Sequence, residues 1–260
     1  MLPHILPLIP PHTAYIEPFC GGAAVLWAKQ KCHTEVINDT NDALIRFYQV
    51  AQAPETRDAL ISKVELSLHA ESIYKTCQNI YSGKTECTEV DYAYAVWYLS
   101  NFSFGMKIMG GFLMGISDFD IPLVVQNKKK LFREQVKRLE GVTLMSRPAL
   151  EILKLNSMNK KEVFAYIDPP YFNSECGHYK GYSESDFIEL LEFLGTDFKG
   201  RFLLSNYPSE VLAEYKVKNK WNYREIKQSL YVNQTEKYAG RSKVETLTWN
   251  YDVANSNLLF

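Results

Sequence analysis

The chain has 260 residues, a net charge of −1 and a hydrophobic fraction of 46%, which is the composition of a globular protein with a substantial core. No apolar run approaches the roughly 20 residues that a membrane-spanning helix needs, so we expect no such helix. The five cysteines form no C-x-x-C pair. We therefore expect neither a disulfide framework nor a metal site, and we expect a reducing cytoplasm as the location.

The N-terminal part predicts a strand, a glycine turn, a helix, a second strand and an acid. Residues 14–19 form the first predicted strand, Cys20-Gly21-Gly22 the turn, and the helix opens at Ala23. The second strand, 35–38, ends at Asp39. This order is typical of a nucleotide-binding βαβ unit, in which the glycines let a cofactor approach the backbone and the acid binds ribose hydroxyls.

Residues 51–139 break this alternation of strands and helices. Hydrophobic spacing predicts helices over 54–80 and after residue 91. A Gly- and Met-rich segment follows, with strand-like pieces at 112–114 and 121–123. We therefore expect an inserted, mainly helical subdomain over 51–139.

The alternation resumes after the insertion. Strands and helices are predicted in turn at 142–145, 148–155, 163–167, 183–194, 201–205 and 209–215. A capping pattern, Ser183 with Asp186, begins the fourth of these. Two closing strands, 223–230 and 244–251, flank a polar loop. The expected fold is α/β, with one domain formed by residues 1–50 and 140–260.

The most informative segment is Asp168-Pro169-Pro170-Tyr171, directly after the buried strand over 163–167. Proline fixes φ, lacks an N–H and favours extended geometry in the residue before it, so this corner is stiff. It holds a carboxylate, backbone carbonyls and an aromatic ring close together, an arrangement suited to gripping a planar ring that bears an amino group. The alternative is an ordinary proline-rich turn at the end of a strand.

Two segments are locally basic although the chain is nearly neutral. They are 128–138, which overlaps a predicted basic helix over 132–139, and 216–243. Such segments are typical of a face that contacts phosphates. The alternative is a solvated helix face and a solvated loop.

Together these motifs resemble the Dam-type (α-group, D12 class) DNA adenine-N6 methyltransferases. The F-x-G-x-G motif of that family is similar to Phe19-Cys20-Gly21-Gly22-Ala23, which follows Glu17-Pro18. The ribose-binding acid of the family resembles Asp39, and its D-P-P-Y motif is present at 168–171. The order of the motifs, with a long insertion between them, is the α-group order, and the resemblance spans nearly the whole chain.

The resemblance implies a Rossmann-like, S-adenosylmethionine-dependent methyltransferase sheet with an inserted target-recognition subdomain. It also implies methyl transfer to the N6 amino group of adenine in double-stranded DNA, by base flipping and direct in-line attack, without a metal. A bacterial or phage-infected cytoplasm and a role in restriction-modification fit such an enzyme. We expect a monomer with no membrane partner, and a partner subunit is the alternative.

The resemblance assigns roles to particular residues. The catalytic residues implied are Asp168, Pro169, Pro170 and Tyr171. The cofactor-binding residues implied are Glu17, Pro18, Phe19, Cys20, Gly21, Gly22, Asp39, Thr40 and Asp168. The DNA-binding residues expected are Lys107, Lys128, Lys129, Lys130, Arg133, Lys180, Tyr182, Lys237 and Arg241.

The sequence departs from the family pattern in three places. The family usually begins with a K-W-x-G-x-K segment that grips the methionine end of the cofactor, and this sequence begins where that segment would have ended. A wrongly placed start codon, an artificial boundary of the sequence and a true loss would each explain this. We expect a true loss to weaken cofactor binding. Ala23 stands where a third glycine is usual. The hairpin region 106–115 offers Lys107 but no arginine, so recognition of GATC is not supported.

Two other functions remain open from the sequence. One is an N4-cytosine or structured-RNA amino-methyltransferase, because similar Pro-Pro-Tyr corners serve those reactions too. The other is a catalytically weak DNA-binding relative that needs a partner subunit. The large insertion between the motifs favours duplex DNA as the substrate.

Overall fold

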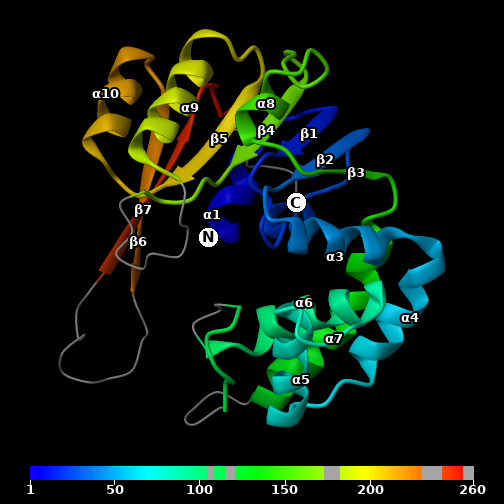
Figure 1. Ribbon diagram of the computed structural model, residues 1–260. Coiled ribbons are helices and arrows are strands. Elements are labelled where there is room, and N and C mark those ends of the chain that lie inside the picture. The colour runs from blue at the N-terminus through cyan, green and yellow to red at the C-terminus, as the bar shows by residue number, and fades with distance from the viewer. Residues whose placement is uncertain (105–107, 115–120, 173–181, 230–241, 254–260) are drawn as a thin grey trace. The chain divides into compact units, whose positions relative to one another are not determined.

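A computed structural model describes residues 1–104, 108–114, 121–172, 182–229 and 242–253 (Figure 1). Within these residues the chain forms a mixed α/β fold around one seven-stranded sheet. The strands are β1 (Ala14–Glu17), β2 (Thr34–Asn38), β3 (Val142–Met145), β4 (Val163–Ile167), β5 (Arg201–Asn206), β6 (Asn222–Ser229) and β7 (Ser242–Trp249). In the described part of the chain, no helix is both long and apolar enough to cross a membrane.

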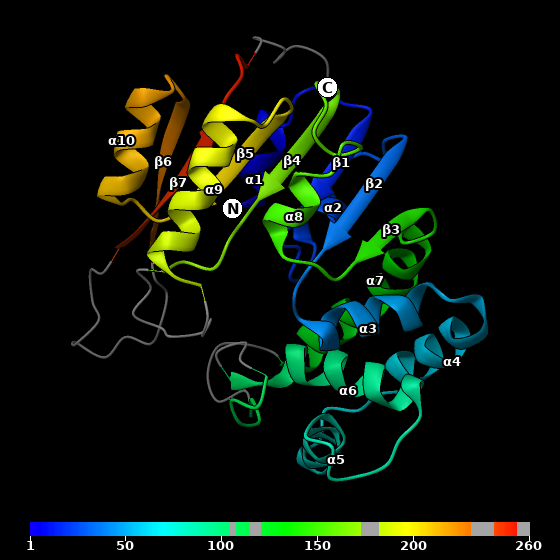
Figure 2. The same cartoon turned by 45° about the horizontal axis from the view of Figure 1, so that its top comes forward.

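The strand order is β3-β2-β1-β4-β5-β7-β6. Strand β1 pairs in parallel with β2 and β4, and β4 pairs in parallel with β5. Strand β7 runs antiparallel between β5 and β6. Figure 2 shows β2, β1, β4 and β5 side by side. The chain order reverses between β1 and β4, and sheets of this kind bind ligands at the carboxyl ends of the strands beside such a reversal.

The chain divides into two compact units. The first consists of Met1–Thr40 and Arg147–Phe260, and the second of Asn41–Ser146. The expected limits of the insertion, 51 and 139, both fall inside the second unit. The helices of the first unit are α1 (Leu2–Ile5), the 3-10 helix η1 (Leu6–Leu8), α2 (Ala24–Ala28), α8 (Ala149–Leu153), α9 (Glu184–Thr196) and α10 (Glu210–Lys218).

The core of the first unit lies on β1, β4 and β5. Every residue of β4 is buried, as expected for a parallel strand that is covered on both faces. Helix α9 begins at the predicted place, because Ser183 and Asp186 form the capping box that the sequence indicated.

The second unit contains helices α3 (Asp42–Gln52), α4 (Pro54–Glu65), α5 (Glu71–Tyr81), α6 (Glu89–Phe102) and α7 (Ile121–Arg138). The prediction of continuous helix over 54–80 was wrong, because the chain leaves the helix after Glu65 and the carbonyl of Leu68 accepts a hydrogen bond from the Tyr98 hydroxyl instead. The prediction of a strand-like piece at 121–123 was also wrong. These residues begin α7, where Pro122 is tolerated because the first helical turn needs no N–H from it.

Candidate active site

The corner after β4 brings a carboxylate and a phenol together. The Tyr171 hydroxyl donates to Asp168 Oδ1 over 2.9 Å, and the Tyr166 hydroxyl lies 3.5 Å from Asp168 Oδ2. Pro169 is buried and Pro170 half-buried between them. The corner therefore holds the Asp168 carboxylate in place through rigid backbone on one side and hydroxyl donors on the other.

The hydroxyl of Tyr171 also contacts two residues from neighbouring strands. It lies 3.3 Å from Ser205 Oγ on β5 and 3.1 Å from Glu245 Oε1 on β7, and Ser205 Oγ donates to Glu245 Oε1 over 2.7 Å. Neither Ser205 nor Glu245 was predicted as a site residue. The signal available for Glu245 is its alternation with Leu247 and Trp249, which places a carboxylate on a buried face of the strand.

Two carboxyl groups of the first unit have pKa values far above their usual range. Burial raises the pKa of Asp168 to about 6, the hydrogen bond from Tyr171 opposes this rise, and the nearby charge of Glu245 adds to it. Burial also raises the pKa of Glu17 to about 7, against hydrogen bonds from Tyr15 and the Leu26 N–H. The negative charge of Asp168 contributes to that second rise. Glu17 and Asp168 therefore act on each other electrostatically.

The glycine turn after β1 is tied to the acid after β2. Gly21 has a φ of +46°, and its N–H donates to Asp39 Oδ2 over 2.9 Å. Gly22 has no positive φ, and a Cβ built on it would meet no described atom within 4 Å. Within the described chain, neither packing nor φ requires glycine at position 22. The lack of a side chain at Gly22 would instead allow a ligand to approach the backbone closely.

Ala23 closes the turn in a left-handed conformation, with a φ of +49°. This region is costly for a residue with a Cβ, and glycine is the residue that adopts it without strain. Ala23 is also fully buried. The position where the family pattern has a glycine is therefore one where glycine suits the backbone better than alanine.

Two buried side chains stabilise the turn through hydrogen bonds. Asn38 Nδ2 donates to the carbonyls of Pro18 and Arg147, each over 2.9 Å, and Asn38 Oδ1 accepts from the Arg147 N–H. Glu17 Oε1 accepts from the Tyr15 hydroxyl over 2.7 Å and from the Leu26 N–H over 2.6 Å. The structure thus places Glu17 as a brace between β1 and the first turn of α2.

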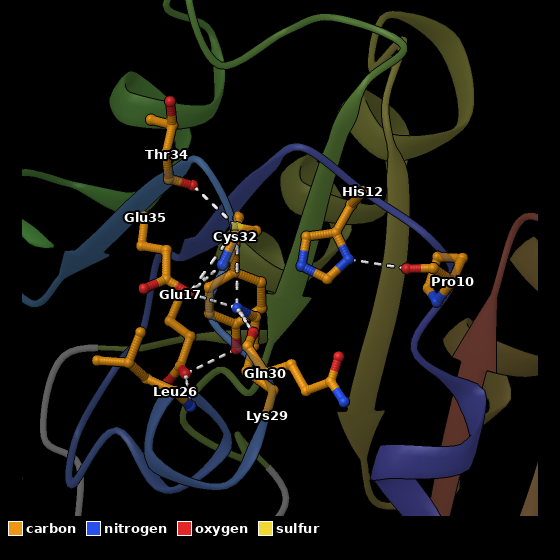
Figure 3. A network of polar contacts seen from close by, with 10 residues as sticks. Pro10, His12, Glu17, Leu26, Lys29, Gln30, Cys32, Thr34 and Glu35 are labelled. Carbon is orange, nitrogen blue, oxygen red and sulfur yellow. Dashed lines mark hydrogen bonds and ion pairs between the residues drawn. The ribbon is translucent and has the colours of Figure 1, made fainter. Parts of the chain in front are cut away.

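This support continues into a buried ion pair, which Figure 3 shows beside Cys32. Lys29 Nζ lies 2.5 Å from Glu35 Oε1, with both side chains almost completely buried. The same ammonium group lies 4.3 Å from the centroid of the Tyr15 ring, whose hydroxyl reaches Glu17. A buried pair of this kind is costly to break, because the remaining charge would be left without a partner.

The remaining predicted cofactor residues lie around the same turn. Pro18 and Cys20 are buried, and Phe19 is half-buried. The Phe19 ring packs edge to face against Tyr182, with centroids 5.9 Å apart. Thr40 is exposed after Asp39. In the described residues, no three His, Cys, Asp or Glu side chains lie close enough together to hold a metal ion.

Four predicted DNA contacts of the second unit lie on α7. Arg133 forms an ion pair with Glu65 over 3.0 Å, and the ammonium of Lys129 donates to the Ser67 carbonyl. Lys128 is half-buried, which lowers its pKa, and Lys130 is exposed. Of the other five predicted contacts, Tyr182 packs against Phe19. The remaining four fall outside the described residues; they are Lys107, Lys180, Lys237 and Arg241.

Comparison with known proteins places the chain among DNA-modifying enzymes. The family described as "D12 class N6 adenine-specific DNA methyltransferase" matches residues 1–239. A curated relative, the Type II methyltransferase M.MjaIII of Methanocaldococcus jannaschii, is 27% identical over 194 residues. That match covers 66% of this chain and 64% of the relative, so the chain spans less than two thirds of the relative's length.

Two solved structures from human proteins are also similar. One is a methyltransferase 10 domain containing protein, with 18% identity, coverage of 57% of this chain and 67% of that one, and a TM-score of 0.28. The other is the N-terminal domain of METTL16 in complex with SAH, with 14% identity, coverage of 70% and 83%, and a TM-score of 0.29.

Proposed function

The chain belongs to the D12 class of N6 adenine-specific DNA methyltransferases, and we propose that it transfers the methyl group of S-adenosylmethionine to the N6 amino group of adenine in double-stranded DNA. The observation that carries this proposal is the position of the Asp168–Tyr171 corner. It follows β4, which pairs with β1, and β1 leads into the glycine turn tied to Asp39. Acceptor groups for an amino group and a cofactor turn thus stand at the same edge of the sheet.

The residues of the turn fit the cofactor chemically. Asp39 accepts from Gly21, and a carboxylate accepts about four hydrogen bonds, so ribose hydroxyls can be held as well. The lack of a side chain at Gly22 permits a ligand to approach the backbone. When bound, S-adenosylmethionine supplies a sulfonium-activated methyl group, which needs no metal to become electrophilic.

The corner supplies what the amino group needs. We propose that the Asp168 carboxylate and the Pro169 carbonyl accept its two N–H donors, so that the nitrogen lone pair turns towards the methyl group. Catalysis then comes from positioning and preorganised charge, without a covalent enzyme intermediate. Because an amino group inside a duplex cannot reach the corner, we propose that the base is flipped out and stacks on the Tyr171 ring. The hydroxyl bonds of Tyr171 to Asp168 and Glu245 support this role by fixing the ring.

We propose that the second unit, which contains the predicted insertion over 51–139, reads the DNA. The exposed Lys130 and the other basic residues of α7 would contact phosphates. The curated relative is named a Type II methyltransferase, and we propose restriction-modification in a cytoplasm as the setting of this chain too.

Nucleoside analysis of methylated product tests the proposal. The protein is incubated with labelled S-adenosylmethionine and, separately, with mixed-sequence duplex DNA and structured RNA, and the products are digested and separated. We expect label in N6-methyladenine from duplex DNA. Label in N4-methylcytosine or only in RNA would establish the alternative reaction. No label, together with no heat of cofactor binding by calorimetry in the presence of DNA, would show a DNA-binding relative instead.

A further inference from the structure

The Tyr171 hydroxyl lies between two carboxyl groups. Its oxygen is 2.9 Å from Asp168 Oδ1 and 3.1 Å from Glu245 Oε1. Glu245 is buried on β7 and already accepts a hydrogen bond from the Ser205 hydroxyl. Three acidic oxygens, two from the corner after β4 and one from β7, are thus joined in one line of hydrogen-bond contacts.

When both carboxyl groups are ionised, the two contacts of the Tyr171 hydroxyl have only one proton between them. A phenol carries one proton and can donate it to one acceptor at a time. If Tyr171 donates to Asp168, its oxygen faces the Glu245 carboxylate with no proton between them, and the reverse holds if it donates to Glu245. One additional proton, on either carboxyl group, completes both hydrogen bonds. The arrangement is therefore built to take up a proton.

The proposed reaction releases one proton. When the adenine amino group gains a methyl group, the nitrogen forms a bond to the methyl carbon. The bond from that carbon to the sulfonium sulfur breaks, and its electron pair stays on sulfur. The nitrogen must then give up one of its two protons. We propose that Glu245 is the second carboxyl group of the active site and shares this proton with Asp168 through the Tyr171 hydroxyl. This inference rests on the proposed function and deepens it.

The transfer balances without any other reactant. Asp168 takes the proton from the methylated nitrogen. Tyr171 then accepts it from Asp168 on its oxygen while passing its own hydroxyl proton to Glu245. The phenol ends as it began, Asp168 returns to the carboxylate form, and Glu245 carries the proton. Asp168 can then bind the next amino group, and Glu245 must lose its proton to solvent before the line can take up another.

Other charged and titratable groups face this line. They are Glu17 on β1, Tyr166 on β4, Tyr207 after β5 and Lys243 on β7. The Tyr207 ring packs against that of Tyr171, with centroids 4.2 Å apart. The positive charge of Lys243 lowers the pKa of Asp168, whereas the negative charge of Glu245 raises it. The Lys243 ammonium lies 5.9 Å from the centroid of the Tyr171 ring.

A purely structural role would be served better by another residue at position 245. A glutamine has the same shape, can accept the same hydrogen bond from Ser205 and can donate its amide N–H to Tyr171. It would do so without placing a second acid beside Asp168, which costs free energy in a buried site. The use of glutamate therefore points to its ability to hold a proton.

The test follows the Asp168 carboxyl group directly, by its carbon-13 chemical shift as a function of pH in the full-length protein. The variants are Glu245→Gln and Tyr171→Phe. The matched control is Glu225→Gln, the same change at an exposed position of the neighbouring strand β6. Asp168→Asn assigns the signal.

We expect the two variants to move the Asp168 titration in opposite directions. Glu245→Gln removes a negative charge and should move it to lower pH by about one unit. Tyr171→Phe removes a hydrogen bond to the ionised form and should move it to higher pH, and Glu225→Gln should leave it unchanged. A Glu245→Gln titration that coincides with that of Glu225→Gln overturns the inference. If Glu245→Gln does not fold, Tyr171→Phe decides, since an unchanged or lowered titration there also overturns it.

This experiment separates the two proposals. The titration needs no methyl transfer. The expected shifts in a protein that methylates nothing would therefore refute the function and the source of the shared proton, but not the coupling of Asp168 to Glu245. A protein that forms N6-methyladenine but shows no shift in Glu245→Gln would refute only the shared proton.

Discussion

The backbone N–H of Gly21 donates to the Oδ2 atom of Asp39 over 2.9 Å, although 18 residues separate them in the chain. This bond joins the turn after β1 to the acid after β2. It fixes the orientation of a carboxylate beside a turn that a ligand can approach closely, which is the arrangement expected of a nucleotide-type cofactor site.

We expect Asp39→Ala to weaken S-adenosylmethionine binding by about ten- to a hundredfold, because hydrogen bonds to a charged group contribute about 1.5–3 kcal/mol. Calorimetric titration measures this affinity. The control is Asp58→Ala, which removes an exposed carboxylate of α4 in the second unit. Equal affinities for Asp39→Ala and the control would remove Asp39 from the cofactor site.

We expect Ala23→Gly to stabilise the protein by about 1 kcal/mol, because it relieves the left-handed conformation of a residue with a Cβ. Urea denaturation measures the change in the free energy of unfolding. The neighbouring Ala24→Gly is the control, since Ala24 is exposed and helical, and glycine there should destabilise the protein. The same sign for both variants would show that Ala23 is not strained.

Sequence reasoning succeeded where local pattern decides structure. The apolar run 163–167 forms β4, and Ser183 with Asp186 caps α9, as predicted. The capping box of Thr88 and Asp91 on α6 was equally legible and was missed. The prediction for residues 121–123 was wrong because two apolar residues around a proline are too few to show a hydrophobic period. The helix beyond them determines their conformation.

Other features could not be predicted, because distant segments create them. Glu245 meets Tyr171 across 74 residues of sequence, through the pairing of β7 with β5. The partners of Arg133 and Lys129 on α4 and after it also depend on helix packing. A basic run in the sequence does not reveal which of its charges are already paired.

Stability should fall as pH rises, in part through Glu17. Its folded-state pKa of about 7 lies above the ordinary value of 4.5, so the folded protein holds this proton more tightly than the unfolded chain does. This contribution to stability is complete below about pH 4.5 and is lost as pH rises through about 7. Glu17→Gln keeps an acceptor for Tyr15 and Leu26 without the titration.

Urea midpoints at about pH 5 and about pH 8 test this. We expect the midpoint of the wild-type protein to fall more between the two values than that of Glu17→Gln. The exposed Glu162→Gln should behave like the wild type. Identical falls for the wild type and Glu17→Gln would show that Glu17 does not titrate in this range.

We expect Lys130→Ala to weaken binding of all duplex sequences alike and to reduce the slope of log affinity against log salt by about 0.9, the effect of one phosphate contact. Fluorescence anisotropy at several salt concentrations measures both. The control is Lys161→Ala, the same change of charge at an exposed position before the amino end of β4. If Lys130→Ala and Lys161→Ala give the same slope, Lys130 does not contact phosphate.

Methyl incorporation by Asp168→Ala tests the central claim most directly. The variant and the wild type are compared on the same duplex DNA in single-turnover assays, with cofactor and DNA affinities measured alongside. The proposed mechanism predicts that N6-methyladenine formation is abolished in Asp168→Ala while DNA affinity stays close to that of the wild type. Near-normal formation of N6-methyladenine by Asp168→Ala would contradict it.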